Sequence, residues 1–159
     1  MPASSAENGI GTRRIVPAKF AHAVLATKQF QAMVDWYTTV LQAEVVHSNG
    51  MLAFMTYDDE HHRIAIAAVP GLEDKPRHSV GLDHLAYTYA NLGDLVYTYE
   101  RLKQAGIMPV VTINHGPTTS LYYRDPTATA SNCKPTISIR SKRSRNSSRP
   151  RRFKRIRSA

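Results

Sequence analysis

Apolar residues in the first half of the chain follow strand-like spacing, then helical spacing, then strand-like spacing again. Residues 18–27 (AKFAHAVLAT) are typical of a strand, and Thr27 is a candidate cap for the helix that follows. The stretches AEVVHS and MLAFMTYD flank the turn Asn49-Gly50, which predicts a hairpin, and HRIAIAAV predicts a further strand. The helix is predicted from apolar residues at i, i+3, i+4, i+7 and i+11, namely Phe30, Met33, Val34, Tyr37 and Leu41.

The same order of elements begins again after a polar connector. VGLDHLAYTY predicts a strand, Asn91 is a candidate cap for a second amphipathic helix, and IMPVVTIN and TTSLYYRD predict two more strands. An offset of 62 aligns the two halves without a gap and pairs His22 with His84 (84 − 22). We therefore predict an α+β fold of two tandem βαβββ modules, residues 17–70 and 80–126, which form a half-open β-barrel or cleft. Residues 1–16 are expected to be a disordered lead-in.

The pattern breaks after Asp125-Pro126, where the last strand of the second module should follow a turn. Thr-Ala-Thr-Ala-Ser-Asn-Cys stands there, followed by a basic run. If one nucleotide is restored at this point, the codons can be regrouped to read DGNRIELQADNF and then DSVEAVEEFFKAAAFQANPIG. This reading supplies a turn, an apolar strand and an amphipathic acidic helix. We interpret residues 127–159 as a frameshifted, mostly disordered tail, with the last strand of module two missing or degraded. A genuine basic tail is the alternative, and TISIR leaves room for a short strand.

The positive charge of the chain lies in this tail. The formal net charge is +9, but residues 134–159 hold 11 of the 21 Lys and Arg and no acidic residue, which leaves 10 basic and 12 acidic residues before them. Such a block is usually solvated, so we expect no specific nucleic-acid partner. No apolar stretch reaches the length of a membrane span, and no secretory signal is recognisable. With Cys133 as the one cysteine, a cytoplasmic protein is the expectation.

The paired modules, their openings FAHAVL and GLDHLAY, and the stretch NHGPTTSLYYRDP together resemble the vicinal oxygen chelate superfamily. This superfamily includes glyoxalases, bleomycin-resistance proteins, fosfomycin-resistance proteins and extradiol dioxygenases. The resemblance is greatest to single-domain proteins like biphenyl-2,3-diol 1,2-dioxygenase. It implies an Fe(II)-dependent, or alternatively Mn(II)-dependent, dioxygenase that cleaves catechol-like aromatic diols with O₂. Members often form dimers, so a homodimer is also expected.

The repeat and the resemblance together predict a metal centre in the intact parent. His22 and His84 occupy equivalent points of two strands, and two histidines with one carboxylate suit non-haem Fe(II). The restored reading places a glutamate where this chain has Asn132, so the third ligand is expected to be lost. The counterpart of that glutamate in module one is Ala65. This residue disfavours the four-ligand site of glyoxalase-type isomerases.

Two further residues favour the dioxygenase reading by resemblance. His115 and Tyr122, with Tyr123 as the alternative if the register slips, match the histidine and tyrosine that assist proton transfer in extradiol enzymes. A fosfomycin-resistance-type enzyme, a glyoxalase-type enzyme and a non-enzymatic ligand-binding protein remain alternatives. We expect His47, His61, His62 and His78 to lie at the surface. We also expect this chain to be an impaired version of its parent.

Overall fold

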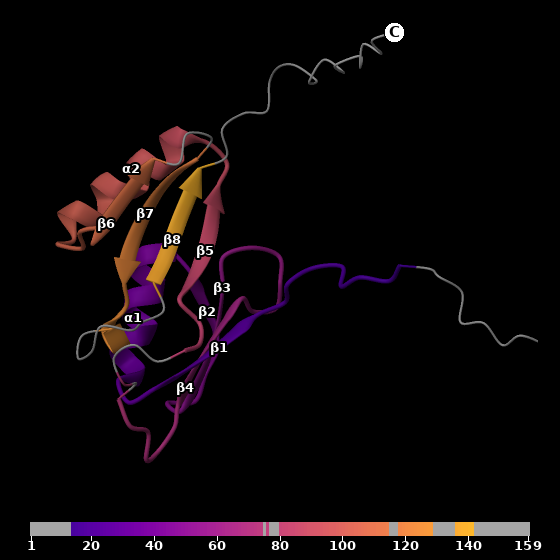
Figure 1. The fold of residues 1–159 in the computed structure, drawn as a ribbon. Helices are drawn as coiled ribbons and strands as arrows, with labels where there is room; N and C mark the ends of the chain where they lie inside the picture. Colours follow the sequence, from indigo (N-terminus) through magenta and orange to yellow (C-terminus); the bar gives the residue numbers. More distant parts are fainter. Residues whose placement is uncertain (1–13, 75, 77–79, 115–117, 129–135, 142–159) are drawn as a thin grey trace, which may run out of the picture.

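A computed structural model of the chain describes residues 14–74, 76, 80–114, 118–128 and 136–141, the last six by their backbone alone. Two βαβββ modules follow one another (Figure 1). Within these residues no helix has the length and apolar character needed to cross a membrane. Module one contains β1 (Ala23–Thr27), α1 (Phe30–Leu41), β2 (Glu44–Ser48), β3 (Leu52–Thr56) and β4 (Ile64–Ala68). Module two contains β5 (His84–Tyr89), α2 (Leu92–Gln104), β6 (Val111–Asn114), β7 (Thr119–Arg124), the short 3₁₀ helix η1 (Pro126–Ala128) and β8 (Thr136–Ser141).

The two modules have the same sheet topology. Sheet A has the strand order β1-β4-β3-β2 and sheet B the order β5-β8-β7-β6. In each sheet the first strand pairs in parallel with the last, and the other described pairs are antiparallel. The predicted α+β class and the module repeat are therefore confirmed, and neither described sheet closes into a barrel.

Helix formation follows the predicted apolar faces. Met33, Val34, Tyr37 and Val40 of α1 are buried, as are Leu95, Thr98 and Leu102 of α2. The Asn91 side chain caps α2 by accepting from the Asp94 N–H at 3.0 Å. The predicted Thr27 cap of α1 is wrong. The helix begins after its N-cap residue Gln29, and no side chain caps it. The Thr27 hydroxyl accepts from the Gln29 N–H at 2.8 Å, which lies before the first helical residue.

Contacts through α1 and α2 join the modules. Asp125 is buried just after β7 and accepts a hydrogen bond from the Tyr37 hydroxyl of α1 at 3.3 Å. The Asp125 carboxylate also accepts from the backbone and the hydroxyl of Thr127, which fixes the turn into η1. On the other side, Arg101 of α2 donates to the Thr39 and Val40 carbonyls near the end of α1. Polar contacts of Tyr37 and Arg101 thus join the two modules.

The last strand of module two is present but is formed late in the chain. A short strand was considered possible at TISIR, and it is confirmed: β8 covers Thr136–Ser141 and pairs with β5 and β7. The connection from Tyr122 to its β8 partner Ser138 spans 16 positions (138 − 122). The matching connection in module one, from Phe54 to Ala65, spans 11 (65 − 54). Sheet B is therefore completed by residues beyond the predicted end of module two at residue 126, and the module extends to Ser141.

Candidate metal centre

His22 lies immediately before β1, on the open face of sheet A. Leu25 and Thr27 are buried beneath α1, whereas Val24 and Ala26 are exposed on the opposite face. Because strand side chains alternate, His22 shares the face of Val24 and Ala26. Its ring lies 4.3 Å from that of His62, and the ring of His62 stacks on Phe54 at 4.4 Å. This column of rings limits the orientations that the His22 imidazole can adopt.

Arg63 fixes the backbone on both sides of His22. Its guanidinium donates to the carbonyls of Phe20 and Ala21, the latter at 3.1 Å, and its own carbonyl accepts from the Ala23 N–H at 3.1 Å. The carboxylate of Asp58 accepts from the Arg63 Nε at 3.0 and 3.1 Å and so orients the guanidinium. The Arg63 side chain and the hydrogen bond from the Ala23 N–H to the Arg63 carbonyl therefore hold residues 20–23 in place.

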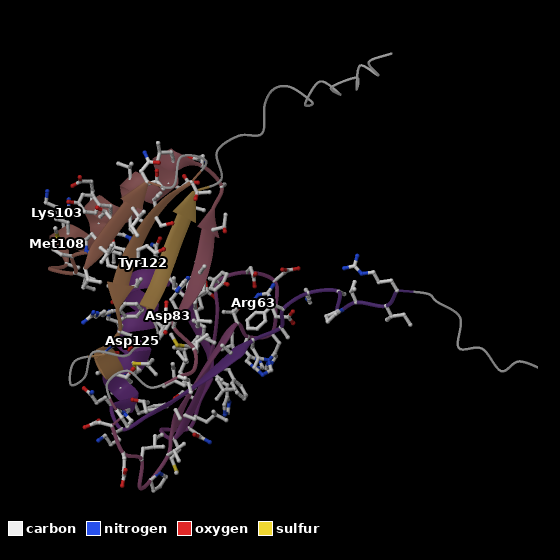
Figure 2. All side chains as sticks on the ribbon, in the orientation of Figure 1. Arg63, Asp83, Lys103, Met108, Tyr122 and Asp125 are labelled. Atoms are coloured by element: carbon white, nitrogen blue, oxygen red, sulfur yellow. The ribbon has the colours of Figure 1, made fainter. Side chains whose placement is uncertain are left out.

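His84 occupies the equivalent position at the start of β5. It is exposed, as are Ala86 and Thr88 on the same strand face, whereas Leu85, Tyr87 and Tyr89 are half-buried on the helix side. The Nδ1 atom of His84 lies 2.7 Å from Oδ2 of Asp83, which lies at the end of sheet B that faces sheet A (Figure 2). When Nδ1–H donates to Asp83, the lone pair resides on Nε2. Metal-binding histidines use this arrangement of an outer carboxylate and a free nitrogen.

Tyr122 lies next to His84 on sheet B. Their rings meet edge to face with centroids 5.7 Å apart, although the two residues belong to β7 and β5. β8 separates these strands, and its residue Ser138 pairs with Ala86 on one side and with Tyr122 on the other. The structure thus brings together two of the residues singled out from the sequence, on the face away from α2.

The third ligand predicted from the sequence is not found among the residues that the structure describes. No group of three His, Cys, Asp or Glu side chains that could hold a metal ion occurs among the described residues. The described donors therefore do not complete the two-histidine, one-carboxylate set. His115 and Asn132 lie outside the described residues, so their predicted places stay predictions.

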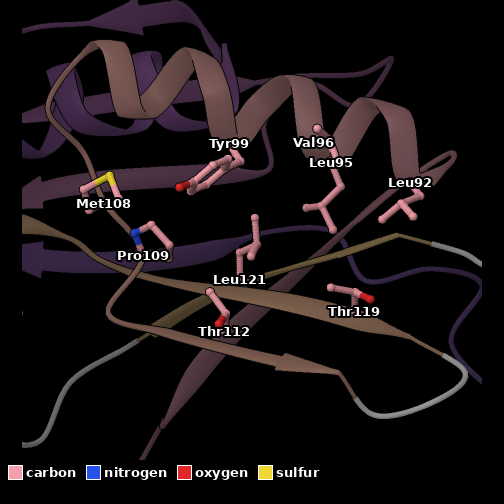
Figure 3. Close-up of a pocket in the computed structure, with 9 residues that line it drawn as sticks. All are labelled: Leu92, Leu95, Val96, Tyr99, Met108, Pro109, Thr112, Thr119 and Leu121. Carbon is pink, nitrogen blue, oxygen red and sulfur yellow. The ribbon is translucent and has the colours of Figure 1, made fainter.

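An apolar groove of about 410 Å³ lies on the other face of sheet B (Figure 3). Thr112 and Leu121 pair with each other on β6 and β7, and their side chains line the groove together with residues of α2 such as Leu95 and Tyr99. Tyr122 follows Leu121 and so points to the opposite face. The groove is consequently separate from the His84–Tyr122 face.

Sequence reasoning missed the roles of three residues around the histidines. His62 was expected at the surface, but it is half-buried between His22 and Phe54. Burial lowers the pKa of His62, and nearby His22 and His61 lower it further. Exposure of His47 and His61 is confirmed, and His78 lies outside the described residues. The sequence offered a weak signal for Arg63 and Asp83. Asp83 directly precedes His84, and Arg63 directly precedes β4, which pairs with the strand that follows His22.

The chain belongs to the glyoxalase/bleomycin resistance protein/dioxygenase superfamily, whose family model matches residues 19–129. Two biphenyl-2,3-diol 1,2-dioxygenases of Rhodococcus globerulus are similar to it. Enzyme 2 is 54% identical over 109 residues, covering 68% of this chain and 57% of the relative. Enzyme 3 is 49% identical over 113 residues, covering 70% and 60%. The chain therefore spans less than two thirds of the length of these relatives.

Solved structures with the same fold are much more distant in sequence. A glyoxylase/bleomycin resistance protein/dioxygenase domain from Frankia sp. has a TM-score of 0.64 and 19% identity, covering 82% of this chain and 96% of that one. A fosfomycin resistance protein from Listeria monocytogenes has a TM-score of 0.60 and 16% identity, covering 79% and 94%. These likenesses establish the fold and do not discriminate between activities.

Proposed function

We propose that this chain derives from an extradiol-type dioxygenase that opens the ring of a catechol-like diol with O₂, and that the chain as written is impaired. The observation that carries the proposal is the 54% identity to a biphenyl-2,3-diol 1,2-dioxygenase over 109 residues. The family match covers residues 19–129 and includes the stretches that carry His22, His84 and Tyr122. Fe(II), with Mn(II) as the alternative, is the proposed metal of the intact parent.

His22 and His84 are the proposed protein ligands that survive in this chain. Fe(II) bound in the parent would supply a site where the two diol oxygens and O₂ meet. The contribution of the chain itself is to hold each imidazole, His22 through its ring stack and Arg63, and His84 through Asp83. Tyr122 is the proposed group that exchanges a proton with the substrate beside His84.

A frameshift at the Pro126 codon is the proposed cause of the impairment. Two observations support it: the family match ends at residue 129, and β8 begins only at Thr136, after a connection that is longer than in module one. Sequencing of the source DNA across this codon tests the cause directly. If a second, independent read contains one more nucleotide at this codon, the frameshift is a sequencing error.

Oxygen uptake tests the activity. The frame-restored protein is expected to consume O₂ with at least one of a panel of catechols and to catalyse no thiol transfer to fosfomycin. Background oxygen uptake with every diol, together with thiol transfer, would reverse this assignment in favour of a fosfomycin-resistance-type enzyme.

A further inference from the structure

The helix of module two has an uncovered side that the helix of module one does not have. By the offset of 62, Val96 of α2 corresponds to Val34 of α1, but Val34 is buried and Val96 is 51% exposed. Tyr99 corresponds to Tyr37, which is fully buried, and is itself only half-buried. In module one, η1 contacts α1, and the Tyr37 hydroxyl donates to Asp125 just before η1. The described residues give α2 no such cover, which leaves the groove between α2, β6 and β7 (Figure 3).

The walls of this groove are apolar. Three of its lining residues, Leu92, Val96 and Met108, are each more than half exposed. No charged side chain is among the lining residues, whose polar groups are the hydroxyls of two threonines and of Tyr99. The volume of about 410 Å³ lies within the range of about 300–1,000 Å³ that small-molecule sites occupy. The groove therefore suits the apolar part of a small molecule.

A lysine stands at one end of the groove. Lys103 follows Tyr99 by four residues and so lies on the same face of α2, with Nζ 5.8 Å from the centre of the Tyr99 ring. Tyr99 and Met108 line one end of the groove, and Leu92 lines the other (Figure 3). Lys103 is exposed and forms no salt bridge with a described residue. At the Leu92 end, the first turn of α2 carries Asp94, whose charge disfavours an anion there.

We propose that the groove binds an amphipathic organic anion, whose apolar chain lies along Val96 and Leu121 and whose carboxylate pairs with Lys103. The chain of such a ligand removes from water the apolar side chains that α2 and the β6–β7 pair leave exposed. Its carboxylate supplies the acidic partner that this lysine lacks among the described residues. The site lies on the face of sheet B opposite His84 and Tyr122, so it is independent of the proposed function.

Calorimetric titration of the full 159-residue chain with decanoate, and with uncharged decanol, tests the charge assignment. Decanoate is expected to bind more tightly than decanol. Lys103→Gln should weaken decanoate binding by about two- to fivefold, the contribution of a partly exposed ion pair, and leave decanol binding unchanged. Lys28→Gln removes an exposed lysine of module one and is the matched control, which should change neither. Equal affinities for the two ligands, or equal losses in the two variants, would overturn the proposal.

A second pair of variants tests the groove itself. Val96→Trp places a larger ring in the groove and should weaken the binding of both ligands. Tyr97→Trp changes an exposed residue of α2 that does not line the groove, and should weaken neither. This pair is needed because residues 134–159 hold 11 Lys and Arg, which also attract carboxylates. Decanoate binding that survives both Lys103→Gln and Val96→Trp would come from elsewhere and would overturn the proposal.

Two measurements on the unchanged chain complete the test. Decanoate should shift the backbone amide NMR signals of β6 and of the second half of α2, and leave those of β1 and β3 in place. A second copy of the chain is the competing occupant of the groove, so sedimentation is compared between the unchanged chain and Val96→Trp. We expect the same oligomeric state in both. A dimer that Val96→Trp dissociates, together with absence of decanoate binding, would overturn the proposal in favour of self-association.

Discussion

The ring of His84 lies edge-on to the ring of Tyr122, with centroids 5.7 Å apart. The two residues are 38 positions apart in the sequence (122 − 84), and a third strand lies between theirs in sheet B. They meet because the strand order of sheet B places β5 and β7 on either side of β8. It places a phenol beside a candidate metal ligand on the sheet face that α2 leaves uncovered.

Tyr122→Phe tests the role of this phenol. In the frame-restored protein we expect the rate of ring cleavage to fall by about 10²–10⁴-fold, the usual contribution of a positioned acid or base. Fe(II) content should not change, because the ring contact with His84 is retained. Tyr97→Phe, at an exposed position of α2, is the control and should leave the rate unaltered. An unchanged rate in Tyr122→Phe would remove Tyr122 from the chemistry.

Arg63→Lys tests how His22 is held. Lysine keeps the charge but cannot donate to both the Ala21 carbonyl and the Asp58 carboxylate with the fixed geometry of a guanidinium. We expect the His22 ring and the amides of residues 21–23 to broaden in NMR spectra, with the His84 resonances unaffected. The matched control is Arg101→Lys, since Arg101 also binds two carbonyls, those of Thr39 and Val40, away from His22. Equal broadening of His22 in both variants would indicate a general loss of stability.

Tyr37→Phe tests the joint between the modules. The substitution removes a donor to the buried Asp125 carboxylate, so we expect a loss of about 1–3 kcal/mol in the free energy of unfolding. Urea denaturation measures this difference, again with Tyr97→Phe as the neutral control. A variant as stable as the parent would show that the contact between Tyr37 and Asp125 does not contribute to module docking.

Alkaline pH should destabilise the fold through buried tyrosines. Burial raises the pKa of Tyr123 to about 12 and raises the pKa values of Tyr37 and Tyr87 as well. Above pH 10.0, the ordinary tyrosine value, the unfolded chain loses protons that the folded chain keeps. The free energy of unfolding should therefore decrease as the pH rises from about 10 to about 12. The part of the phenolate absorbance that comes from the buried tyrosines should rise together with the loss of the circular dichroism signal. Full ionisation of all tyrosines at pH 10.5 in a folded protein would contradict this expectation.

Periodicity and the repeat were sufficient to predict most of the fold. The spacing of Phe30, Met33, Val34 and Tyr37 predicted α1, although not its cap, and the Asn49-Gly50 turn predicted the β2–β3 hairpin. The offset of 62 correctly placed α2 after Asn91. These signals are local, and burial of one face is enough to enforce them.

The site was less accessible from sequence because its contacts are non-local. The stack of His22, His62 and Phe54 joins three separate stretches of module one, and no spacing rule relates them. The register of β8 depends on which residues after Pro126 pair with both β5 and β7. The number of residues after Pro126 does not predict which of them form β8, because pairing with β5 and β7 determines this.

The central claim is that His22 and His84 hold one metal ion in the intact parent. Fe(II) content of the frame-restored protein, measured after anaerobic loading and desalting, tests it most directly beside His22→Ala and His84→Ala. We predict one iron per chain in the unsubstituted protein and loss of most of it in each variant, because removal of one of three ligands leaves an incomplete site. Equal iron in all three proteins would contradict the claim.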